Sequence, residues 1–397
     1  MRGRTLLTSF LVAGLVVVLV VVLERPSTPQ PSSGQSTSSM TLPLTSASSS
    51  TSESSVVLAM GHLDDPTNTF WELFVRSASD SSWRLRTPPG VADNGGLILA
   101  TSAVGSFTAG ILPSLHLTFS PLAQSMNGGQ AWSPGHFPTG LAVAPNALAS
   151  ASSGALFAVG SNDGGSLYAS EGIASSWKRV ITSRSLASSV KGCTVRSITA
   201  VTLSSSGKPI LGLSCSSGAR LGVVTASQAP PATGSWRTIG PSLGGDPGVT
   251  SVLRLEATAD GITGLATITS KTHTESLVAV WGQGAAPLWE QSQRRALPAG
   301  WAIASTSVGP SGQDQQVAAL LRSGAKRQIV EVDRGSKAWS ELPSPPANTE
   351  AITTLASEID AFVVSGSRLS IWTLPKGAST WHKAEGVVVP LQYGSSS

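Results

Sequence analysis

Short runs of alternating apolar and polar residues, separated by turn residues, follow one another along the chain after residue 55. In one such run, Leu253, Leu255 and Ala257 alternate with polar residues up to Thr258. A period of two is typical of a β-strand with one buried face. A helix would need apolar residues at i, i+3 and i+4 over ten or more positions, and these runs lack that spacing. The pattern therefore predicts an all-β fold.

Tryptophans recur along these runs, and each of them follows an apolar run and a polar turn. They lie 42 to 59 residues apart, at Trp83, Trp132, Trp177, Trp236, Trp289, Trp339 and Trp381. Internal periods of about 40–50 residues indicate propellers or arrays. The unit that leads to Trp289 holds four strand-like runs, at 251–261, 262–270, 275–282 and 288–293. Because a propeller blade has four antiparallel strands, we predict a seven-bladed β-propeller over residues 56–397, with six blades as the alternative count.

The two ends of the repeat region suggest how the ring closes. The first unit, residues 56–86, offers three strand-like runs, whereas 386–392 is a spare run at the C-terminus. We predict that 386–392 completes the first blade, because this pairing would hide the edges of both ends.

The N-terminus predicts a location. Residues 6–23 contain no charged side chain and follow Arg2 and Arg4. As a helix this segment would span about 27 Å, the thickness of a bilayer core. Since positive residues stay on the cytoplasmic side, residues 1–25 are expected to be a cytoplasmic stub and a single-pass signal anchor in the plasma membrane. The C-terminal domain would then be extracytoplasmic; secretion after signal cleavage is the first alternative, and a buried core helix is the second.

The stretch between this segment and the strand-like runs has a different composition. Residues 26–55 are mainly Ser, Thr, Pro, Gln and Gly. Such a stretch buries too little apolar surface to offset its ordering entropy. We predict a disordered linker over 26–55.

Composition narrows the class of partner. Charged residues make up 12% of the chain, and after residue 25 there are 23 basic and 21 acidic side chains. A balance this even, without clustered Lys or Arg, argues against nucleic acid as a partner. The five histidines match no zinc-ligand spacing, and no phosphate-binding loop is present, so no metal and no cofactor are expected.

One of the turns before a tryptophan carries a known pattern. Ser125, Asn127, Gly129 and Trp132 follow the spacing Ser-x-Asp-x-Gly-x-x-Trp, with Asn127 at the Asp position. This turn resembles the Asp-box of bacterial-neuraminidase (BNR) repeats, and residues 56–392 look like a sialidase-like β-propeller. In such a turn the Asx side chain caps backbone N–H groups. The resemblance also implies that the tryptophan packs between adjacent blades. The other six turns match the Asp-box only in fragments.

The resemblance gives no indication of catalysis. The Asp-box is a structural motif, and sialidase activity would imply an Arg-Ile-Pro segment near the start, which this chain lacks. The carboxylate pairs Glu256–Asp260 and Glu358–Asp360 are interpreted as solvated strand and turn residues, like Asp64 and Asp65. We therefore predict a non-catalytic member of the superfamily, without catalytic residues.

Two further pairs of residues are candidates for specific roles. Arg294 and Arg295 follow the outer strand of the fifth blade, where a loop could bring them to an anion, although a solvated charge pair is the simpler interpretation. Cys193 and Cys215 flank a predicted hairpin that turns at 204–207. A disulfide between them would need a bulge, because strict pairing places Cys193 opposite residue 218. Two buried free thiols are the alternative.

Together these features predict a membrane-anchored, extracytoplasmic binding or scaffolding module. Its partner would be a cell-envelope glycan or another protein. The alternatives are a divergent sialidase-like glycoside hydrolase and an assembly factor for a membrane complex.

Overall fold

The computed structural model describes the chain from residue 44 to residue 388, with gaps. The described ranges are 44–48, 54–62, 69–77, 82–86, 96–101, 107–112, 122–127, 130–134, 145–151, 153–160, 164–227, 236–244, 248–258, 261–283, 288–309, 315–355, 357–365 and 368–388. The apolar segment 6–23 lies outside them. Within these ranges no helix is long and apolar enough to cross a membrane.

Four-stranded antiparallel sheets with their strands in chain order are the recurring element of the unit Thr41–Ser397. Five sheets have this form: β1 (Leu44–Ser48), β2 (Ser54–His62), β3 (Thr69–Ser77) and β4 (Arg84–Leu85); β5 (Gly96–Thr101), β6 (Phe107–Leu112), β7 (Leu122–Ser125) and β8 (Ser133–Pro134); β9 (Pro145–Ser150), β10 (Leu156–Gly160), β11 (Ser166–Ser170) and β12 (Lys178–Thr182); β22 (Ala302–Val308), β23 (Gln316–Ser323), β24 (Lys326–Asp333) and β25 (Ser340–Glu341); β26 (Thr349–Thr354), β27 (Glu358–Ser365), β28 (Arg368–Pro375) and β29 (His382–Val388).

A sixth sheet has nine strands. They are β13 (Val195–Leu203), β14 (Pro209–Cys215), β15 (Val223–Ala226), β16 (Trp236–Thr238), β17 (Val249–Thr258), β18 (Gly261–Thr269), β19 (Glu275–Gln283), β20 (Leu288–Gln291) and β21 (Arg295–Ala296). Ser214 and Cys215 of β14 pair with Ser251 and Thr250 of β17, and this short ladder joins β13–β16 to β17–β20. A single-turn helix, α1 (Ser183–Ala187), lies between β12 and β13.

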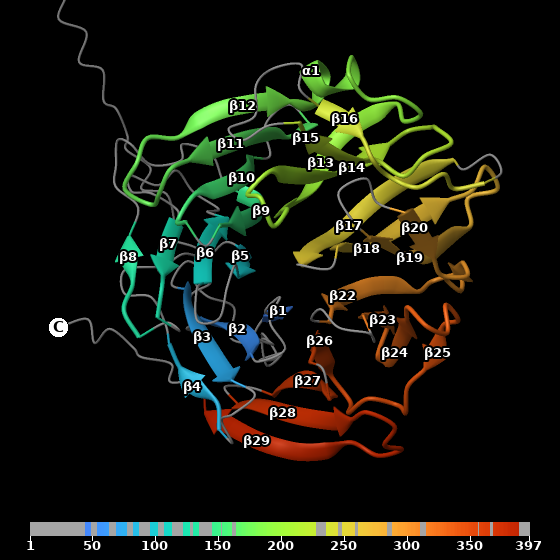
Figure 1. Cartoon of the computed structure of the whole chain (residues 1–397). Coiled ribbons are helices and arrows are strands. Elements are labelled where there is room, and N and C mark those ends of the chain that lie inside the picture. The colour runs from blue at the N-terminus through green and yellow to red at the C-terminus, as the bar shows by residue number, and fades with distance from the viewer. Residues whose placement is uncertain are drawn as a thin grey trace, which may run out of the picture. The chain divides into compact units, whose positions relative to one another are not determined.

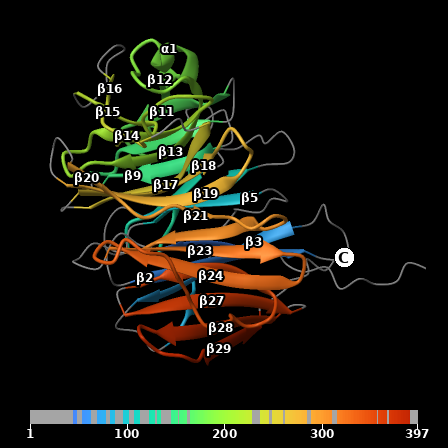
Figure 2. The same ribbon diagram turned by 90° about the vertical axis from the view of Figure 1, so that its right-hand side faces the viewer.

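The first strands of successive groups lie next to one another. Contacts run from β1 to β5, β9, β13, β17, β22 and β26, and β26 in turn contacts β1. Figure 1 shows these strands around a common centre, with the later strands of each group farther out. Figure 2 shows sheets β22–β25 and β26–β29 side by side.

The core lies between neighbouring sheets. The largest described cluster has sixteen buried residues from β9–β12, α1, β13–β16 and the adjoining loops, including Phe157, Leu186 and Leu211. A smaller cluster between β22–β25 and β26–β29 has five, including Leu320 and Ile352. In both places apolar side chains from two neighbouring groups of strands are buried against one another.

The predicted strands agree with the structure over most of the repeat. The runs predicted at 251–261, 262–270, 275–282 and 288–293 correspond to β17 to β20, with ends that differ by no more than three residues. Each tryptophan of the repeat stands just before, or within, the outermost strand of its group, namely β4, β8, β12, β16, β20, β25 and β29.

Both ends of the repeat differ from the prediction. Leu44–Ser48, inside the stretch predicted to be a linker, is β1 and pairs with β2. Residues 386–388 do not complete the first sheet, because they continue β29 and pair with Ser370 to Arg368 of β28. The first sheet thus takes its fourth strand from the N-terminal side. Residues 389–392 lie outside the described ranges.

Candidate functional site

The turn that resembles an Asp-box is built as its residue types require. The Oγ of Ser125 donates to Oδ1 of Asn127 at 3.0 Å, and the backbone N–H of Ala131 donates to the same oxygen at 2.8 Å. The asparagine side chain thereby caps the turn between β7 and β8. Gly129 of this motif lies outside the described residues.

A second turn of the same kind lies between β24 and β25. The Oδ1 atom of Asp333 accepts a hydrogen bond from the backbone N–H of Ser336 at 2.7 Å, and Oδ2 accepts one from its hydroxyl at 3.0 Å. Burial alone would raise the pKa of Asp333, but the hydrogen bonds from Ser336 and Gly335 and the positive charge of Lys376 together lower it. In the sequence this turn matched the Asp-box only in fragments, because Trp339 stands six residues after Asp333 rather than five.

Four of the seven tryptophans of the repeat connect their group of strands to the group before it. The indole Nε1–H of Trp132 donates to the carbonyl oxygen of Arg86 at 2.9 Å. Corresponding bonds run from Trp339 to the Gln293 carbonyl at 2.8 Å and from Trp381 to the Pro343 carbonyl at 3.0 Å. Trp289 donates in the same way to the Ile239 carbonyl. In these four cases the acceptor lies three or four residues after the preceding tryptophan of the repeat, so the repeat has a defined structural role.

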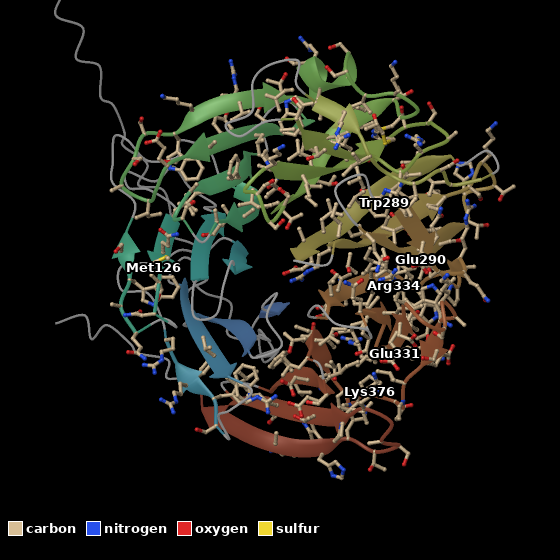
Figure 3. All side chains as sticks on the ribbon, viewed as in Figure 1. Met126, Trp289, Glu290, Glu331, Arg334 and Lys376 are labelled. Atoms are coloured by element: carbon tan, nitrogen blue, oxygen red, sulfur yellow. A yellow bond between two sulfur atoms is a disulfide. The ribbon has the colours of Figure 1, made fainter. Side chains whose placement is uncertain are left out.

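Ion pairs also join neighbouring sheets. Glu290 of β20 binds Arg334 and Lys337, which lie in the turn after β24 (Figure 3). Both cations donate hydrogen bonds to Glu290, and these bonds lower its pKa. Arg327 of β24 binds Glu350 of β26 at 3.2 Å. These charges hold the sheets together.

The first sheet and the last sheet are joined by a buried charge cluster. Arg76 of β3 binds Asp360 of β27 at 2.8 Å and also binds Glu358. Asp360 is fully buried and accepts a further hydrogen bond from the hydroxyl of Thr373 at 2.7 Å. Trp83 packs edge-on against Phe362, with 5.4 Å between ring centroids. The interpretation of Glu358 and Asp360 as solvated turn residues was therefore wrong, because β27 carries both of them into an interface between sheets.

The two cysteines lie close together at the open end of the β13–β14 hairpin. Cys193 and Cys215 form a disulfide with a Cα–Cα distance of 5.5 Å. The register of β13 against β14 shifts twice, between Val195 and Ser197 and between Ile198 and Ala200. These irregularities take up the extra residues that strict pairing would leave over.

The arginine pair after β20 contacts other parts of the protein. Arg294 donates through Nη2 to the carbonyl oxygens of Leu243 and Gly244, at 2.5 Å and 3.2 Å. Arg295, in β21, binds Glu341 of β25. Each guanidinium thus has an internal partner, and an anion contact at this pair stays a prediction.

Glu256 lies on β17 and is half-buried, although the sequence suggested a solvated position. Burial raises its pKa from 4.5 to about 7, and the positive charge of Arg254 offsets part of the shift. Its predicted partner, Asp260, lies outside the described residues. No group of three or more His, Cys, Asp or Glu side chains that could hold a metal ion occurs in the described part of the chain.

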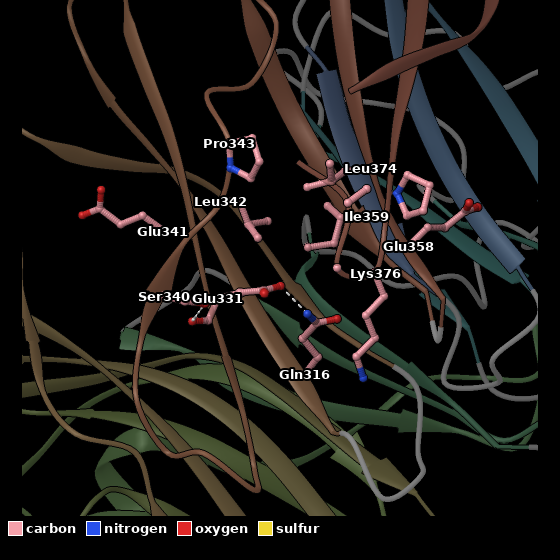
Figure 4. Close-up of a pocket in the computed structure, with 13 residues that line it drawn as sticks. Gln316, Glu331, Ser340, Glu341, Leu342, Pro343, Glu358, Ile359, Leu374 and Lys376 are labelled. Atoms are coloured by element: carbon pink, nitrogen blue, oxygen red, sulfur yellow. Dashed lines mark hydrogen bonds between the residues drawn. The ribbon is translucent and has the colours of Figure 1, made fainter. Parts of the chain in front are cut away.

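A cavity of about 240 Å³ lies between sheets β22–β25 and β26–β29. Figure 4 shows Leu342, Ile359 and Leu374 grouped together, with Gln316, Glu331 and Lys376 below them and Glu341 and Glu358 to either side. Its polar lining includes Gln316, Glu331, Glu341, Glu358 and Lys376, and its apolar lining includes Leu342, Pro343, Ile359, Leu374 and Pro375.

The carboxylates of this cavity differ in their partners. Glu341 binds Arg295 and Glu358 binds Arg76. Glu331 accepts a hydrogen bond from the side-chain amide of Gln316. Burial raises the pKa of Glu331, and the nearby Asp333 carboxylate raises it further. The cavity therefore holds one carboxyl group whose hydrogen bonds come from neutral donors.

No pattern in the sequence indicates this cavity. Its lining residues lie between Gln316 and Ala378 and come from β23, β24, β25, β27, β28 and adjacent turns. The pattern of apolar and polar residues in each of these strands is typical of an ordinary half-buried strand. The cavity depends on how two sheets pack, which alternation along a single strand does not encode.

Comparisons with known proteins complete the description. No family model matches the chain, and no curated protein sequence matches it. Among solved structures, the chain is similar to YCF48 bound to a D1 peptide, with 14% identity, 75% of this chain and 83% of that chain covered, and a TM-score of 0.45.

Two further solved structures span most of the chain. One is a fungal lectin from Aleuria aurantia, described as a six-bladed β-propeller with fucose recognition, with 12% identity, coverage of 89% and 98%, and a TM-score of 0.42. The other is the Hadza microbial sialidase Hz136, with 12% identity, coverage of 78% and 74%, and a TM-score of 0.40. This protein is all-β, is built mainly from four-stranded antiparallel sheets and has propeller-like neighbours.

Proposed function

We propose that the unit Thr41–Ser397 is a seven-bladed β-propeller, held outside the cytoplasm, that acts as a binding or scaffolding module. The cycle of contacts through the seven inner strands β1, β5, β9, β13, β17, β22 and β26 supports the blade count. The Cys193–Cys215 disulfide supports export, because such bonds persist in oxidising compartments. The charge-free segment after Arg2 and Arg4 supports anchoring.

The observation that carries the binding function is the cavity between sheets β22–β25 and β26–β29. It combines apolar walls with a few polar groups, which is the usual make-up of a ligand site. The sheets on both sides are fixed by inter-sheet ion pairs and by the indole bond from Trp381 to the Pro343 carbonyl. A rigid frame of this kind presents a site without rearrangement, and therefore lowers the cost of binding.

The partner is a cell-envelope glycan or a protein. If the partner is a protein of a membrane complex, this chain could act as an assembly factor for that complex. Site-specific photo-crosslinking in the native cells tests the proposal. A photoreactive residue at Ala378, in the cavity lining, should give a defined adduct that mass spectrometry identifies. The same residue at the exposed Ser205, on the β13–β14 turn, is the control.

Equal adducts at Ala378 and Ser205, or no adduct at either position, would contradict a binding role for the cavity. A glycan array probed with the purified full-length chain separates the two partner classes. Binding to one glycan type supports the glycan partner. An adduct at Ala378 without any array signal supports the protein partner.

A glycoside hydrolase is the second candidate, and one observation favours it. Glu331 and Asp333 lie two residues apart on β24, and their pKa values shift in opposite directions. Carboxyl groups whose pKa values diverge are typical of an acid and its partner in glycosidases. Release of fluorophore from aryl glycosides by the wild-type chain, abolished by Glu331→Gln, would replace the binding proposal with this one.

The location is tested separately. A reporter that is active only outside the cytoplasm, fused after Ser397, should be active. A cytoplasm-only reporter at the same position should be silent. Activity of the cytoplasmic reporter would overturn the proposed topology without affecting the cavity.

A further inference from the structure

Glu331 stands out among the acidic residues that line the cavity. Its neighbours Glu341 and Glu358 are neutralised by Arg295 and Arg76, in ion pairs that reach outward to other elements. Glu331 is half-buried, and its carboxyl accepts a hydrogen bond from the side-chain amide of Gln316 (Figure 4). A carboxylate is stabilised most by a cation that donates hydrogen bonds to it.

The charges around Glu331 set the sign of the ligand. Asp333 lies on the same strand and adds negative potential, while Lys376 supplies the positive charge nearby. The cavity lining contains three glutamates and one lysine. Glu341 and Glu358 are already paired with arginines, so Glu331 is the lining carboxyl that remains to pair with a cation.

The shape and walls of the cavity fit a cation on an alkyl stem. Its volume of about 240 Å³ is below the range of about 300–1,000 Å³ for drug-sized ligands, so it suits a single side chain. Leu342, Ile359 and Leu374 supply apolar contact for a methylene stem. Lysine and arginine side chains have this construction, with an apolar stem and a charged end.

The cavity also opens beside the outermost strand of its sheet. Among the described strands, β25 has a hydrogen-bonded neighbour, β24, on one side only. Glu341 of β25 has a side chain that is 57% exposed. A polypeptide that passes along this edge could place one side chain in the cavity, which favours a protein over a free small amine.

We propose that the cavity between β24–β25 and β27–β28 is a socket for a lysine or arginine side chain of a partner polypeptide, with Glu331 as the residue that binds its charge. This inference rests on the proposed binding function and assigns a partner class to the same cavity. It selects the protein partner over the glycan.

The burial of Glu331 gives the site a pH dependence. Because burial and Asp333 raise the pKa of Glu331 while Lys376 lowers it, the carboxyl is protonated over a wider range than a free glutamate. A cation binds the ionised form, so binding should strengthen as pH rises through the pKa of Glu331. The groups that face it are Asp333, Gln316, Ser340 and Lys376.

The test uses the full-length chain and three probes: Nα-acetyl-arginine methylamide, Nα-acetyl-lysine methylamide and the neutral Nα-acetyl-norleucine methylamide. Titrations followed by NMR give the dissociation constants. The cationic probes should bind at least about tenfold more tightly than norleucine, because a hydrogen bond to a charged group contributes on this scale. Glu331→Gln should remove that preference, and circular dichroism checks that the variant is folded.

Glu341→Gln is the matched control. It also removes a carboxylate from the lining, but one that Arg295 already neutralises, so the preference for cations should change by less than about threefold. Equal affinity for the charged and neutral probes, or unchanged preference in Glu331→Gln, would overturn the socket. If the socket fails in this way but the glycan array shows binding, the general binding function still holds. Failure of the socket can therefore be distinguished from failure of the proposed function.

Discussion

The interfaces that hold neighbouring groups of strands together in this protein differ in their balance of apolar burial and ion pairs. The apolar interface, between β9–β12 and β13–β16, contains the cluster of sixteen buried residues and the Cys193–Cys215 disulfide. The charged interfaces join β26–β29 to its two neighbours, through Arg327–Glu350 on one side and Arg76–Asp360 on the other.

The contrast indicates where binding can occur. Apolar burial is non-directional and fills the space between sheets to the density of a crystal. Ion pairs act at fixed points and in fixed geometry, so the sheets can be held with space left between them. In the described part of the chain, the cavity lined by Glu331 lies at a charged interface, beside the smaller apolar cluster of five residues.

The largest expected effect is in the apolar interface. Leu211→Ala removes a fully buried side chain of β14 and should lower the free energy of unfolding by about 2–5 kcal/mol. Denaturant titration measures it. Leu288→Ala, at a side chain that is 82% exposed, is the matched control and should change it by less than about 0.5 kcal/mol. Equal effects at the two sites would contradict a tightly packed apolar interface.

The disulfide contributes to the same interface. It joins residues 22 positions apart. The double variant Cys193→Ala/Cys215→Ala should lower the free energy of unfolding by about 3 kcal/mol, because its unfolded chain is less constrained. Intact mass after alkylation, with and without reductant, verifies the bond in the wild-type protein. Two alkylated thiols in the unreduced, denatured chain would show that it does not form.

A pH titration probes Glu256, which belongs to neither interface. Folding raises its pKa from 4.5 to about 7, so its stabilising contribution is complete below pH 4.5 and is lost as pH rises through about 7. From pH 4.5 to about pH 7, the free energy of unfolding of the wild type should fall by about 2–3 kcal/mol relative to that of Glu256→Gln. Parallel stability curves for the two proteins would mean that Glu256 is not buried as described.

The charged interface between the first and last sheets should respond to loss of its buried acid. Asp360→Asn leaves Glu358 as the acidic partner of Arg76 and should lower the free energy of unfolding by about 2 kcal/mol. Glu290→Gln removes the partly exposed ion pairs with Arg334 and Lys337, and should lower the free energy of unfolding by less than about 1 kcal/mol. If Asp360→Asn is as mild as Glu290→Gln, the charge cluster does not hold the first and last sheets together.

Much of the fold could be predicted from residue patterns, because strand alternation and the tryptophan spacing are local signals. Residues 249–291 and the positions of Trp83 to Trp381 illustrate this. Leu44–Ser48 could not be recognised as a strand, since its Ser- and Thr-rich sequence matches a linker and its order depends on pairing with β2.

The candidate site is a harder case. Asp360 and Glu358 looked solvated because their sequence, around Ile359, resembles a turn, and their partner Arg76 lies more than 280 residues away. The cavity around Glu331 likewise combines residues from five strands of two sheets. Contacts between sheets are set by three-dimensional packing, which a one-dimensional pattern does not contain.

Hydrogen-exchange mass spectrometry of the full-length chain, with and without Nα-acetyl-arginine methylamide, tests the central claim most directly. The account predicts slower exchange in β24, in β27 and in the turn Pro375–Ala378 when the probe is present, with β14 of the apolar interface unchanged. Unchanged exchange at the cavity, or equal slowing in β14, would contradict a binding site at the charged interface.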